Sequence, residues 1–336
     1  MAKLRMNQAI AQALADEMRE DPTVVVFGED VAEADGIFKA SEGLLEEFGP
    51  LRVRDTPISE MGFTGAAVGA AMTGLRPVIE FMFVEFLGVA LDQIVTEAAK
   101  LHYLSAGAYS VPLVARASVG AGAGFGCQHS QTLETWLMNT PGLKLAVASG
   151  PRTAYGLLRA AIRDDNPVVF FEPRVLYGSR EDFEPGADAV IPLGTAEVVA
   201  QGADVTIVGL GQSVGIAQAA GEAGDWSADI IDLRTLVPWD EDTVAASVAK
   251  TGRLVLVEEN PYTGGWGAHI AAHVAGRMFG DLKAPVHRIT APDVHVPFNI
   301  DLERRYIPSS EYVTQQVTEL LDRGRIPAAW WEVTAR

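Results

Sequence analysis

Glu60 is the carboxylate in this sequence whose surroundings most directly suggest chemistry. It follows the short apolar approach Thr56-Pro57-Ile58 and precedes a segment, 61–72, built almost wholly from Gly, Ala, Met and Val. A charge in so apolar a segment is costly to bury without a partner. One interpretation is charge complementarity with a helix N-terminus, worth roughly a few tenths of a kcal/mol. The other is a carboxyl group in an apolar cleft that shares a proton with a ligand nitrogen.

The residues around Glu60 suit a flat, heteroaromatic ligand. Residues 80–86, Glu-Phe-Met-Phe-Val-Glu-Phe, bring Met82 and Phe86 to the end of the next predicted strand. Large apolar side chains of this kind pack well against a ring. Small residues at helical spacing predict a face that another backbone can approach closely: Gly62, Gly65, Ala66, Gly69, Ala70 and Thr73. Periodicity alone does not choose between the two interpretations of Glu60.

A glycine-rich loop at 117–131 is the second candidate for chemistry. Glycine stands at alternate positions, which permits positive φ and close approach of a ligand: Gly120, Gly122, Gly124 and Gly126. The loop then delivers His129 between Gln128 and Gln131, where an imidazole would act as a general acid or base. The alternative is a capping group for the following helix. Cys127 is interpreted as a small hydrophobic residue, because no third group that would orient a nucleophile is visible.

Two further patterns have both a chemical and a structural interpretation. Residues 209–215, Gly-Leu-Gly-Gln-Ser-Val-Gly, follow a predicted strand with Asp232 about 20 residues on, which approaches a dinucleotide-binding fingerprint. The third glycine is one place late, at Gly215, so a tight strand-to-helix turn is favoured. His269 and His273 have helical metal-ligand spacing, but no Glu, Asp or Cys completes a known site, so packing is favoured.

An α/β scaffold must position these residues, because apolar β-branched segments alternate with Ala-rich helical ones. In the first half the predicted strands are 23–30, 76–83, 111–118, 143–150 and 166–173, and the helices are 89–107 and 151–165. A stretch rich in Gly, Pro and acid, 176–194, is interpreted as a linker. Beyond it we expect strands at 203–211, 227–238, 252–260 and 284–292, with helices near 214–222, 240–250, 267–279 and 310–323. The sequence therefore predicts two doubly wound domains, 1–185 and 186–336.

Composition and charge exclude several classes of function. A net charge of −18 argues against nucleic acid or an anionic membrane as the main partner. The single cysteine rules out an internal disulfide and suits a reducing cytoplasm. Residues 1–21 predict an amphipathic helix without an apolar signal core, and no uncharged apolar run reaches the roughly 18 residues of a membrane span. We therefore expect a cytoplasmic protein.

Longer stretches of the sequence resemble one protein family. The stretches are GEDV (28–31), RDTPISEMGFTGAAVGAAMTGLRPVIEFMF (54–83), LDQIVTEAAK (91–100), QHSQ (128–131), PGLKL (141–145), AAIRDDNPVVFFE (160–172), DLRTLVPWD (232–240) and TGRLVLVEE (251–259). In collinear order from about residue 5 to about residue 325, the chain is similar to β subunits of the thiamine-diphosphate-dependent decarboxylating component of 2-oxoacid dehydrogenase complexes. This transketolase-like family includes pyruvate, branched-chain 2-oxoacid and acetoin dehydrogenases.

The resemblance implies a transketolase-like pyrimidine-binding domain followed by a transketolase C-terminal-like domain. It implies that Glu60 hydrogen-bonds the aminopyrimidine ring nitrogen of thiamine diphosphate and helps to activate the cofactor. His129 matches the histidine that faces the substrate and assists acyl transfer to a lipoyl group. Three apolar residues and one carboxylate are implied to line or border the pyrimidine pocket: Ile58, Met82, Phe86 and Glu29.

The family also implies partners and ions. Its diphosphate-binding domain, with a G-D-G…N magnesium motif, lies on a separate α chain. The motif is missing here, since Gly224-Asp225 and Gly280-Asp281 continue into other residues. The implied assembly is an α2β2 heterotetramer with Mg2+ on the α subunit and a lipoyl-bearing acyltransferase core as partner. A possible potassium site, which a water-filled loop would imitate, comprises Leu113, Ala161, Ile162, Asp164 and Asn166.

The leading functional hypothesis is decarboxylation of a 2-oxoacid and reductive acylation of the lipoyl partner. Acetoin cleavage is a variant with the same cofactor. A nicotinamide-binding oxidoreductase that uses residues 209–215 is a distant alternative, and a non-catalytic scaffold has no need of Glu60 and His129. Beyond the resemblance, Trp330 and Trp331 are expected to form an anchor or a self-association patch, which leaves docking of the acyltransferase core open.

Overall fold

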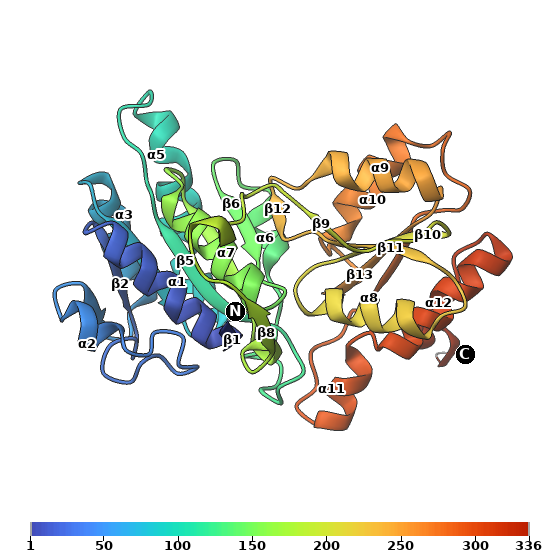
Figure 1. The fold of residues 1–336 in the computed structure, drawn as a ribbon, viewed down its shortest axis with the longest axis horizontal. Helices are drawn as coiled ribbons and strands as arrows, with labels where there is room; N and C mark the ends of the chain where they lie inside the picture. The colour runs from blue at the N-terminus through green and yellow to red at the C-terminus, as the bar shows by residue number, and fades with distance from the viewer. Residues whose placement is uncertain (1, 335–336) are drawn as a thin grey trace. The chain divides into compact units, whose positions relative to one another are not determined.

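The computed structural model describes residues 2–334 of the chain. These residues form two compact units. The first comprises the chain up to Gly120 with Trp136–Leu193 and Leu236–Pro238; the second comprises Ala121–Thr135, Gly194–Thr235 and the chain from Trp239 onward. Each unit contains a largely parallel sheet covered by helices (Figure 1). The predicted α/β fold class is confirmed.

The first unit is built on a seven-stranded sheet with the order β12-β6-β7-β5-β4-β2-β3. Its neighbours β2–β3, β2–β4, β4–β5, β5–β7 and β6–β7 are all parallel. Strands β4, β5 and β7 are buried almost end to end, as a sheet covered on both faces requires. The strands are β2 (Val24–Gly28), β3 (Val53–Asp55), β4 (Arg76–Phe81), β5 (Val114–Val119), β6 (Lys144–Val147), β7 (Val168–Pro173) and β12 (Thr235–Val237).

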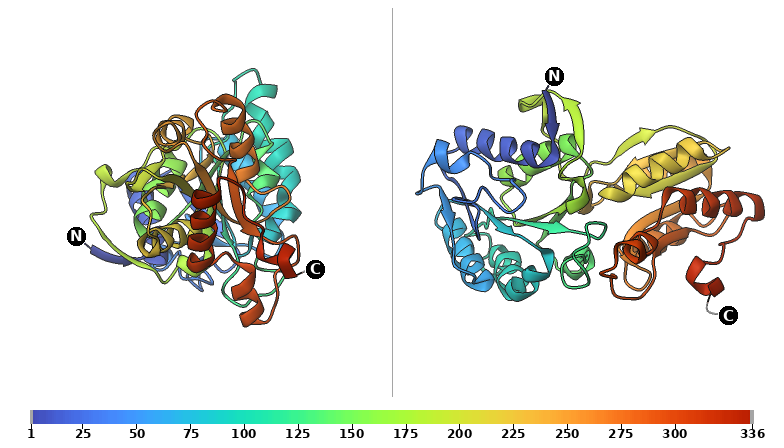
Figure 2. Two further views of the ribbon diagram at one scale, coloured as in Figure 1. Left: turned by 90° about the vertical axis from the view of Figure 1, so that its right-hand side faces the viewer. Right: turned by 90° about the horizontal axis from the view of Figure 1, so that it is seen from below.

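Helices cover both faces of this sheet (Figure 2, right). On one face α1 (Met6–Glu20) and α7 (Pro151–Arg163) pack against each other and share a buried apolar cluster with the strands. On the other face lie α3 (Glu60–Met72) and α4 (Val84–Leu91). A π-helical turn (Asp92–Ala98) and α5 (Ala99–Leu104) continue α4, so the predicted helix 89–107 is three joined pieces. Two short helices, α2 (Leu44–Phe48) and α6 (Glu134–Met138), complete the set.

Three local expectations were wrong. The chain does not enter a helix at once, because β1 (Ala2–Arg5) precedes α1 and pairs antiparallel with β8 (Arg180–Phe183). The expected linker 176–194 therefore contains a strand. The expected strand 227–238 is two strands, β11 (Ala228–Asp232) and β12, because Arg234 adopts a φ of +61° and turns the chain into the other sheet.

The second unit has a five-stranded sheet in the order β14-β13-β10-β11-β9, parallel except for β9 at one edge. Helices α8 and α12 pack on it over a core that includes Ile207, Val255 and Val317. The strands are β9 (Glu197–Ala200), β10 (Val205–Gly209), β11, β13 (Leu254–Pro261) and β14 (His287–Ala291). The helices are α8 (Gln212–Ala223), α9 (Glu241–Thr251), α10 (Gly267–Arg277), α11 (Ile300–Tyr306), α12 (Ser310–Arg323) and α13 (Trp330–Thr334).

No helix within residues 2–334 combines the length and the apolar character that crossing a membrane requires.

Candidate active site

The carboxyl edge of the first sheet brings together most of the predicted cofactor residues. In the register of the sheet, Gly28 at the end of β2 lies opposite Glu80 in β4 and Asp55 at the end of β3. The Thr56 N–H donates to the carbonyl of Gly28 at 2.8 Å, which holds the segment after β3 against the end of β2. Glu29, residues 56–60 and Met82 therefore follow three neighbouring parallel strands. Open α/β sheets bind ligands in the crevice at such ends.

Glu60 is the first residue of α3, and its side chain is 8% exposed. The helix N-terminus around it is formed by the backbone, with Phe63 N–H donating to the Ser59 carbonyl at 2.9 Å. Among the described residues the Glu60 carboxylate has neither a hydrogen-bond donor nor an ion-pair partner. A ligand or another chain that covers this carboxylate would have to supply a donor in place of water.

A second carboxylate, Glu29, faces Glu60. Burial raises the pKa of Glu29, and the negative charges of Glu60 and Asp30 raise it further, while a backbone N–H at Ser59 acts in the opposite sense. The Glu29 Oε1 atom is buried, and within residues 2–334 it has no hydrogen-bond partner. Burial and the nearby negative charges therefore favour the protonated form of the Glu29 carboxyl group. This arrangement suits a ligand with N–H donors and a basic ring nitrogen.

The segment after β4 is held in place by two residues that the sequence reasoning missed. Ser118 Oγ donates to the Met82 carbonyl, and Arg174 Nη2 donates to Ser118 Oγ at 3.2 Å. The Arg174 guanidinium also lies 4.7 Å from the centre of the Phe83 ring, and Phe83 packs edge-on against Phe86 at 5.8 Å. Hydrogen bonds and a cation–π contact thus fix the segment that carries Met82 and Phe86.

The predicted pocket residues differ in exposure. Met82 and Phe86 are half-buried, whereas Ile58 is 84% exposed. Among the described residues, therefore, little packs against Ile58, and its apolar surface is open to a ligand or another chain.

A fully buried ion cluster lies in the strands beneath this edge. Arg116 in β5 donates to both oxygens of Glu172 at 2.7 and 3.0 Å and to Glu80 at 2.9 Å. The Tyr177 hydroxyl donates to Glu172 at 2.7 Å. Burial raises the pKa of Glu80, although Arg116 opposes this, and burial together with Glu172 raises the pKa of Tyr177. The signal in the sequence is a charged residue inside each of three apolar strands: Glu80 in β4, Arg116 in β5 and Glu172 in β7.

His129 belongs to the second unit, in the loop 121–135. All four alternate glycines adopt positive φ, from +71° at Gly126 to +103° at Gly122, as their spacing predicts. His129 is half-buried and Cys127 is exposed. The hydroxyl of Ser130 is buried and finds no hydrogen-bond partner in the described part of the chain. The loop therefore offers polar groups next to an imidazole.

Residues 209–215 form a tight strand-to-helix turn. A Cβ at Gly209 would lie 2.9 Å from the backbone nitrogen of Val214, so glycine is required for α8 to start this close to β10. Gly211 has a φ of +59°. Asp232 accepts a hydrogen bond from the backbone N–H of Arg234 at 3.1 Å. These contacts favour the structural interpretation.

The two histidines with metal-like spacing are in packing contacts. His273 lies edge-on to Trp239 at 5.2 Å and 2.6 Å from Glu241, and His269 also lies edge-on to Trp239. No group of three or more His, Cys, Asp or Glu side chains in the described residues is arranged to hold a metal ion.

In the predicted potassium site, protein donors contact the oxygens of four residues: Leu113, Ala161, Ile162 and Asp164. The Leu113 carbonyl accepts from Val168 N–H at 2.9 Å, and the Ile162 carbonyl accepts from Arg76 at 3.1 Å. The Asp164 carboxylate accepts from Lys144 and from Asn166, and these hydrogen bonds lower its pKa despite partial burial. Asp164 N–H donates to the Ala161 carbonyl at 3.3 Å. A potassium ion there, which remains a prediction, has to share these oxygens with two cationic side chains.

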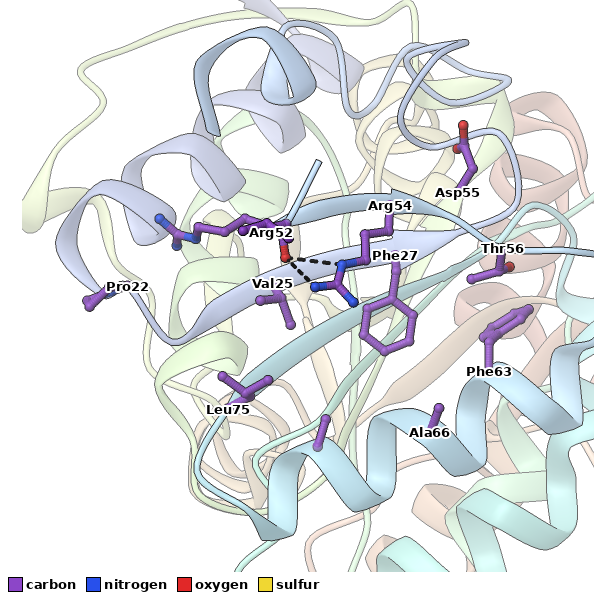
Figure 3. Close-up of a pocket in the computed structure, with 12 residues that line it drawn as sticks. Pro22, Val25, Phe27, Arg52, Arg54, Asp55, Thr56, Phe63, Ala66 and Leu75 are labelled. Atoms are coloured by element: carbon purple, nitrogen blue, oxygen red, sulfur yellow. Dashed lines mark hydrogen bonds between the residues drawn. The ribbon is translucent and has the colours of Figure 1, made fainter. Parts of the chain in front are cut away.

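A cavity of about 500 Å³ lies between α3 and strands β2 and β3 (Figure 3). Its walls are mostly apolar, including Val25, Phe27 and Phe63, and the Arg54 guanidinium donates back to the Leu51 carbonyl. Glu29, Glu60, Met82 and Phe86 do not line it. The cavity is therefore separate from the carboxyl-edge site, although Thr56 borders both.

Comparison with known proteins decides the family. Residues 2–180 match the model of the transketolase pyrimidine binding domain, and residues 194–313 match that of the transketolase C-terminal domain. The mitochondrial pyruvate dehydrogenase E1 component subunit beta-2 of Oryza sativa subsp. japonica is 45% identical over 321 residues, which cover 93% of this chain and 85% of that protein. The chain belongs to the pyruvate dehydrogenase E1 β-subunit family.

Other members of the E1 β family are similarly close. The E1 component subunit beta of Rhizobium meliloti is 45% identical over 94% of this chain and 70% of that protein. That of Rickettsia felis is 42% identical over 95% of this chain and 98% of that protein. Among solved structures, one titled split gene transketolase, inactive beta4 tetramer, matches with a TM-score of 0.78 at 23% identity, over 96% of this chain and 99% of that chain. That likeness shows the fold.

Proposed function

We propose that this chain is the β subunit of a thiamine-diphosphate-dependent 2-oxoacid dehydrogenase, that its substrate is pyruvate, and that it works only with an α subunit. Pyruvate and the α subunit are supported by the names of the relatives, which are β subunits of pyruvate dehydrogenase E1 components. No observation favours acetoin. The observation that carries the proposal is the buried Glu60 carboxylate, which has no protein donor and faces Glu29 at the carboxyl edge of the first sheet.

The residues present fit the aminopyrimidine of thiamine diphosphate. An aminopyrimidine offers N–H donors and a basic ring nitrogen, which are what the buried Glu29 oxygen and the Glu60 carboxyl group lack. Met82, Phe86 and the exposed Ile58 supply the apolar surface that a ring requires. When bound, the cofactor supplies a nucleophilic carbon for attack on a 2-oxo group.

Glu60 is the residue that holds or gives up a proton at the pyrimidine ring. Glu60 is largely buried at the start of α3, and its negative charge is one of the causes that raise the pKa of the neighbouring Glu29. Arg174 and Ser118 keep the Met82 segment in place against the ring. His129 is proposed to act on the substrate side as the acid or base during acyl transfer to a lipoyl group.

The α subunit is proposed to hold the diphosphate and Mg2+, since the expected magnesium motif is not in this sequence. An α2β2 heterotetramer that passes the acyl group to a lipoyl acyltransferase core follows from this division. The exposed Ile58 beside the site is consistent with burial by the α subunit.

The test is co-expression with the α chain and assay of the pair with pyruvate, branched-chain 2-oxoacids and acetoin. Glu60→Gln should assemble normally and lose about 10²- to 10⁴-fold in turnover, the usual contribution of a general acid or base. Glu46→Gln, an exposed carboxylate in α2, is the matched control and should keep full activity. Near-normal turnover of the Glu60 variant would overturn the assigned role, and preference for acetoin would overturn the substrate.

A further inference from the structure

The backbone of the glycine-rich loop is held by a buried carboxylate from a distant part of the chain. Glu303 in α11 is 0% exposed. Its two oxygens accept hydrogen bonds from the N–H groups of Gly122 at 2.8 Å and Gly124 at 2.9 Å. Within the described residues, these two backbone N–H groups are the hydrogen-bond donors to the Glu303 carboxylate. Because a buried charge is costly without such donors, the carboxylate and the loop conformation stabilise each other.

Positive φ at the glycines makes this contact possible. Backbone that alternates between right- and left-handed conformations turns successive N–H groups toward one point and forms a concave anion site. Gly122 and Gly124, with φ of +103° and +77°, have that geometry, and the Glu303 carboxylate is the anion. A side chain on either residue would disfavour the left-handed conformation.

Two residues of strand β13 form hydrogen bonds with the two ends of the loop 121–135. At the start, the Ala121 N–H donates to Glu259, which also accepts from Gln212 at the beginning of α8. At the end, Asn260 Nδ2 donates to Glu134 at 2.8 Å, and burial raises the pKa of Glu134. Between these fixed points the chain carries Cys127, Gln128 and His129.

We propose that Glu303 is a positioning residue: by holding the Gly122 and Gly124 amides, with Glu259 holding Ala121, it sets the place of His129 for acyl transfer. The inference rests on the proposed function for the role of His129. Glu303 itself touches no reacting atom. Its removal therefore affects the step that uses His129 more than the step that uses Glu60.

The test uses the assembled enzyme with Glu303→Gln, which keeps the shape of the side chain but removes its charge and one acceptor. Hydrogen exchange measured by mass spectrometry should show the peptide 120–131 exchanging at least tenfold faster. Acyl transfer to a lipoyl domain should fall about tenfold or more, while pyruvate decarboxylation with an artificial electron acceptor stays within about twofold. Asp301→Asn, an exposed carboxylate on the same helix, is the matched control and should change neither.

Gly124→Ala provides a second route to the same result if Glu303→Gln does not fold. Its Cβ would lie 3.9 Å from Ile300, in ordinary contact, so only the positive φ opposes it. Unchanged exchange in 120–131, or an equal fall in both half-reactions, would overturn the positioning role. Absence of both half-reactions in the wild-type enzyme would overturn the proposed function instead, and the exchange measurement would still decide whether Glu303 holds the loop.

Discussion

The carboxyl ends of the strands in the two sheets are similar in topology but differ in whether the polar groups there already have hydrogen-bond partners. At the edge of the first sheet, strands β4, β2 and β3 end beside Glu60 and Glu29. Among the described residues, the Glu60 carboxylate has no hydrogen-bond donor, and one buried oxygen of Glu29 has no hydrogen-bond partner. At the second, the end of β13 and the start of α8 are covered by the chain's own loop 121–135 through Glu259, Gln212 and Asn260.

This difference indicates which of the two sheet edges is a ligand-binding site. A crevice at the ends of parallel strands is a binding site only if polar groups there still need partners. The second crevice resembles a dinucleotide site in sequence, but protein atoms already satisfy its groups. The first crevice keeps its carboxylates for a ligand, and the second uses its carboxylates to hold a loop.

Removal of the buried Arg116 guanidinium from the first sheet should have the largest effect on stability. Arg116→Met leaves Glu80 and Glu172 buried without their cation, which costs about 3–5 kcal/mol. Urea unfolding of the variant measures this loss. Arg54→Met, at an exposed position of β3 at the end of the same sheet, should cost no more than about 0.5 kcal/mol. Equal losses for the two variants would mean that the ion cluster does not support the edge.

Loosening the segment after β4 should weaken cofactor binding with little loss of stability. Arg174→Met removes the hydrogen bond to Ser118 and the contact with the Phe83 ring. We expect about tenfold weaker thiamine diphosphate binding by the assembled enzyme, measured by fluorescence quenching, from contacts worth about 1–2 kcal/mol. Arg174→Lys should recover part of the affinity. Unchanged affinity in Arg174→Met would show that the segment does not position the ring.

The carboxylate pair at the first edge should appear in the pH dependence of stability. Because the pKa of Glu29 is raised in the folded state, the folded chain holds that proton more tightly than the unfolded chain. The resulting stability is complete below the ordinary pKa of 4.5 and is lost as the pH rises through the raised value. Thermal unfolding of Glu29→Gln should lack this decline, and the exposed Glu33→Gln should retain it. Parallel pH profiles for wild type and Glu29→Gln would contradict the raised pKa of Glu29, whose first cause is burial and whose second is the charge of Glu60.

The second edge should show no ligand binding at all. Titration of the isolated chain with NADH, followed by fluorescence, should give no saturable signal up to about 100 μM, because protein contacts fill the crevice beside residues 209–215. Saturable micromolar binding would restore the nicotinamide interpretation and weaken the contrast between the two edges.

Local patterns in the sequence predicted helices and strands. They did not predict which segments far apart in the chain pair with each other. Apolar β-branched segments predicted most strands of both sheets but not the short β3 and β9, and glycine spacing predicted the positive φ of the loop at 120–126. Pairing of β1 with β8 joins two segments about 180 residues apart, so no local pattern revealed it.

The site was predictable to a similar depth. Glu60 stood out because its own neighbours are apolar, and the structure does bury it at a helix start. Arg116 lies 36 residues from Glu80 and 56 from Glu172, and Glu303 lies 181 residues from Gly122. These partners depend on which strands and loops meet, and periodicity carries no information about that.

The central claim is that the Glu60 carboxyl group shares a proton with the pyrimidine ring of thiamine diphosphate. Hydrogen–deuterium exchange at the reactive carbon of the bound cofactor, followed by acid quench and proton NMR in the assembled enzyme, tests it most directly. With the cofactor saturated, Glu60→Gln should slow this exchange by about 10²- to 10⁴-fold relative to wild type. Equal exchange rates in the two enzymes would contradict the account.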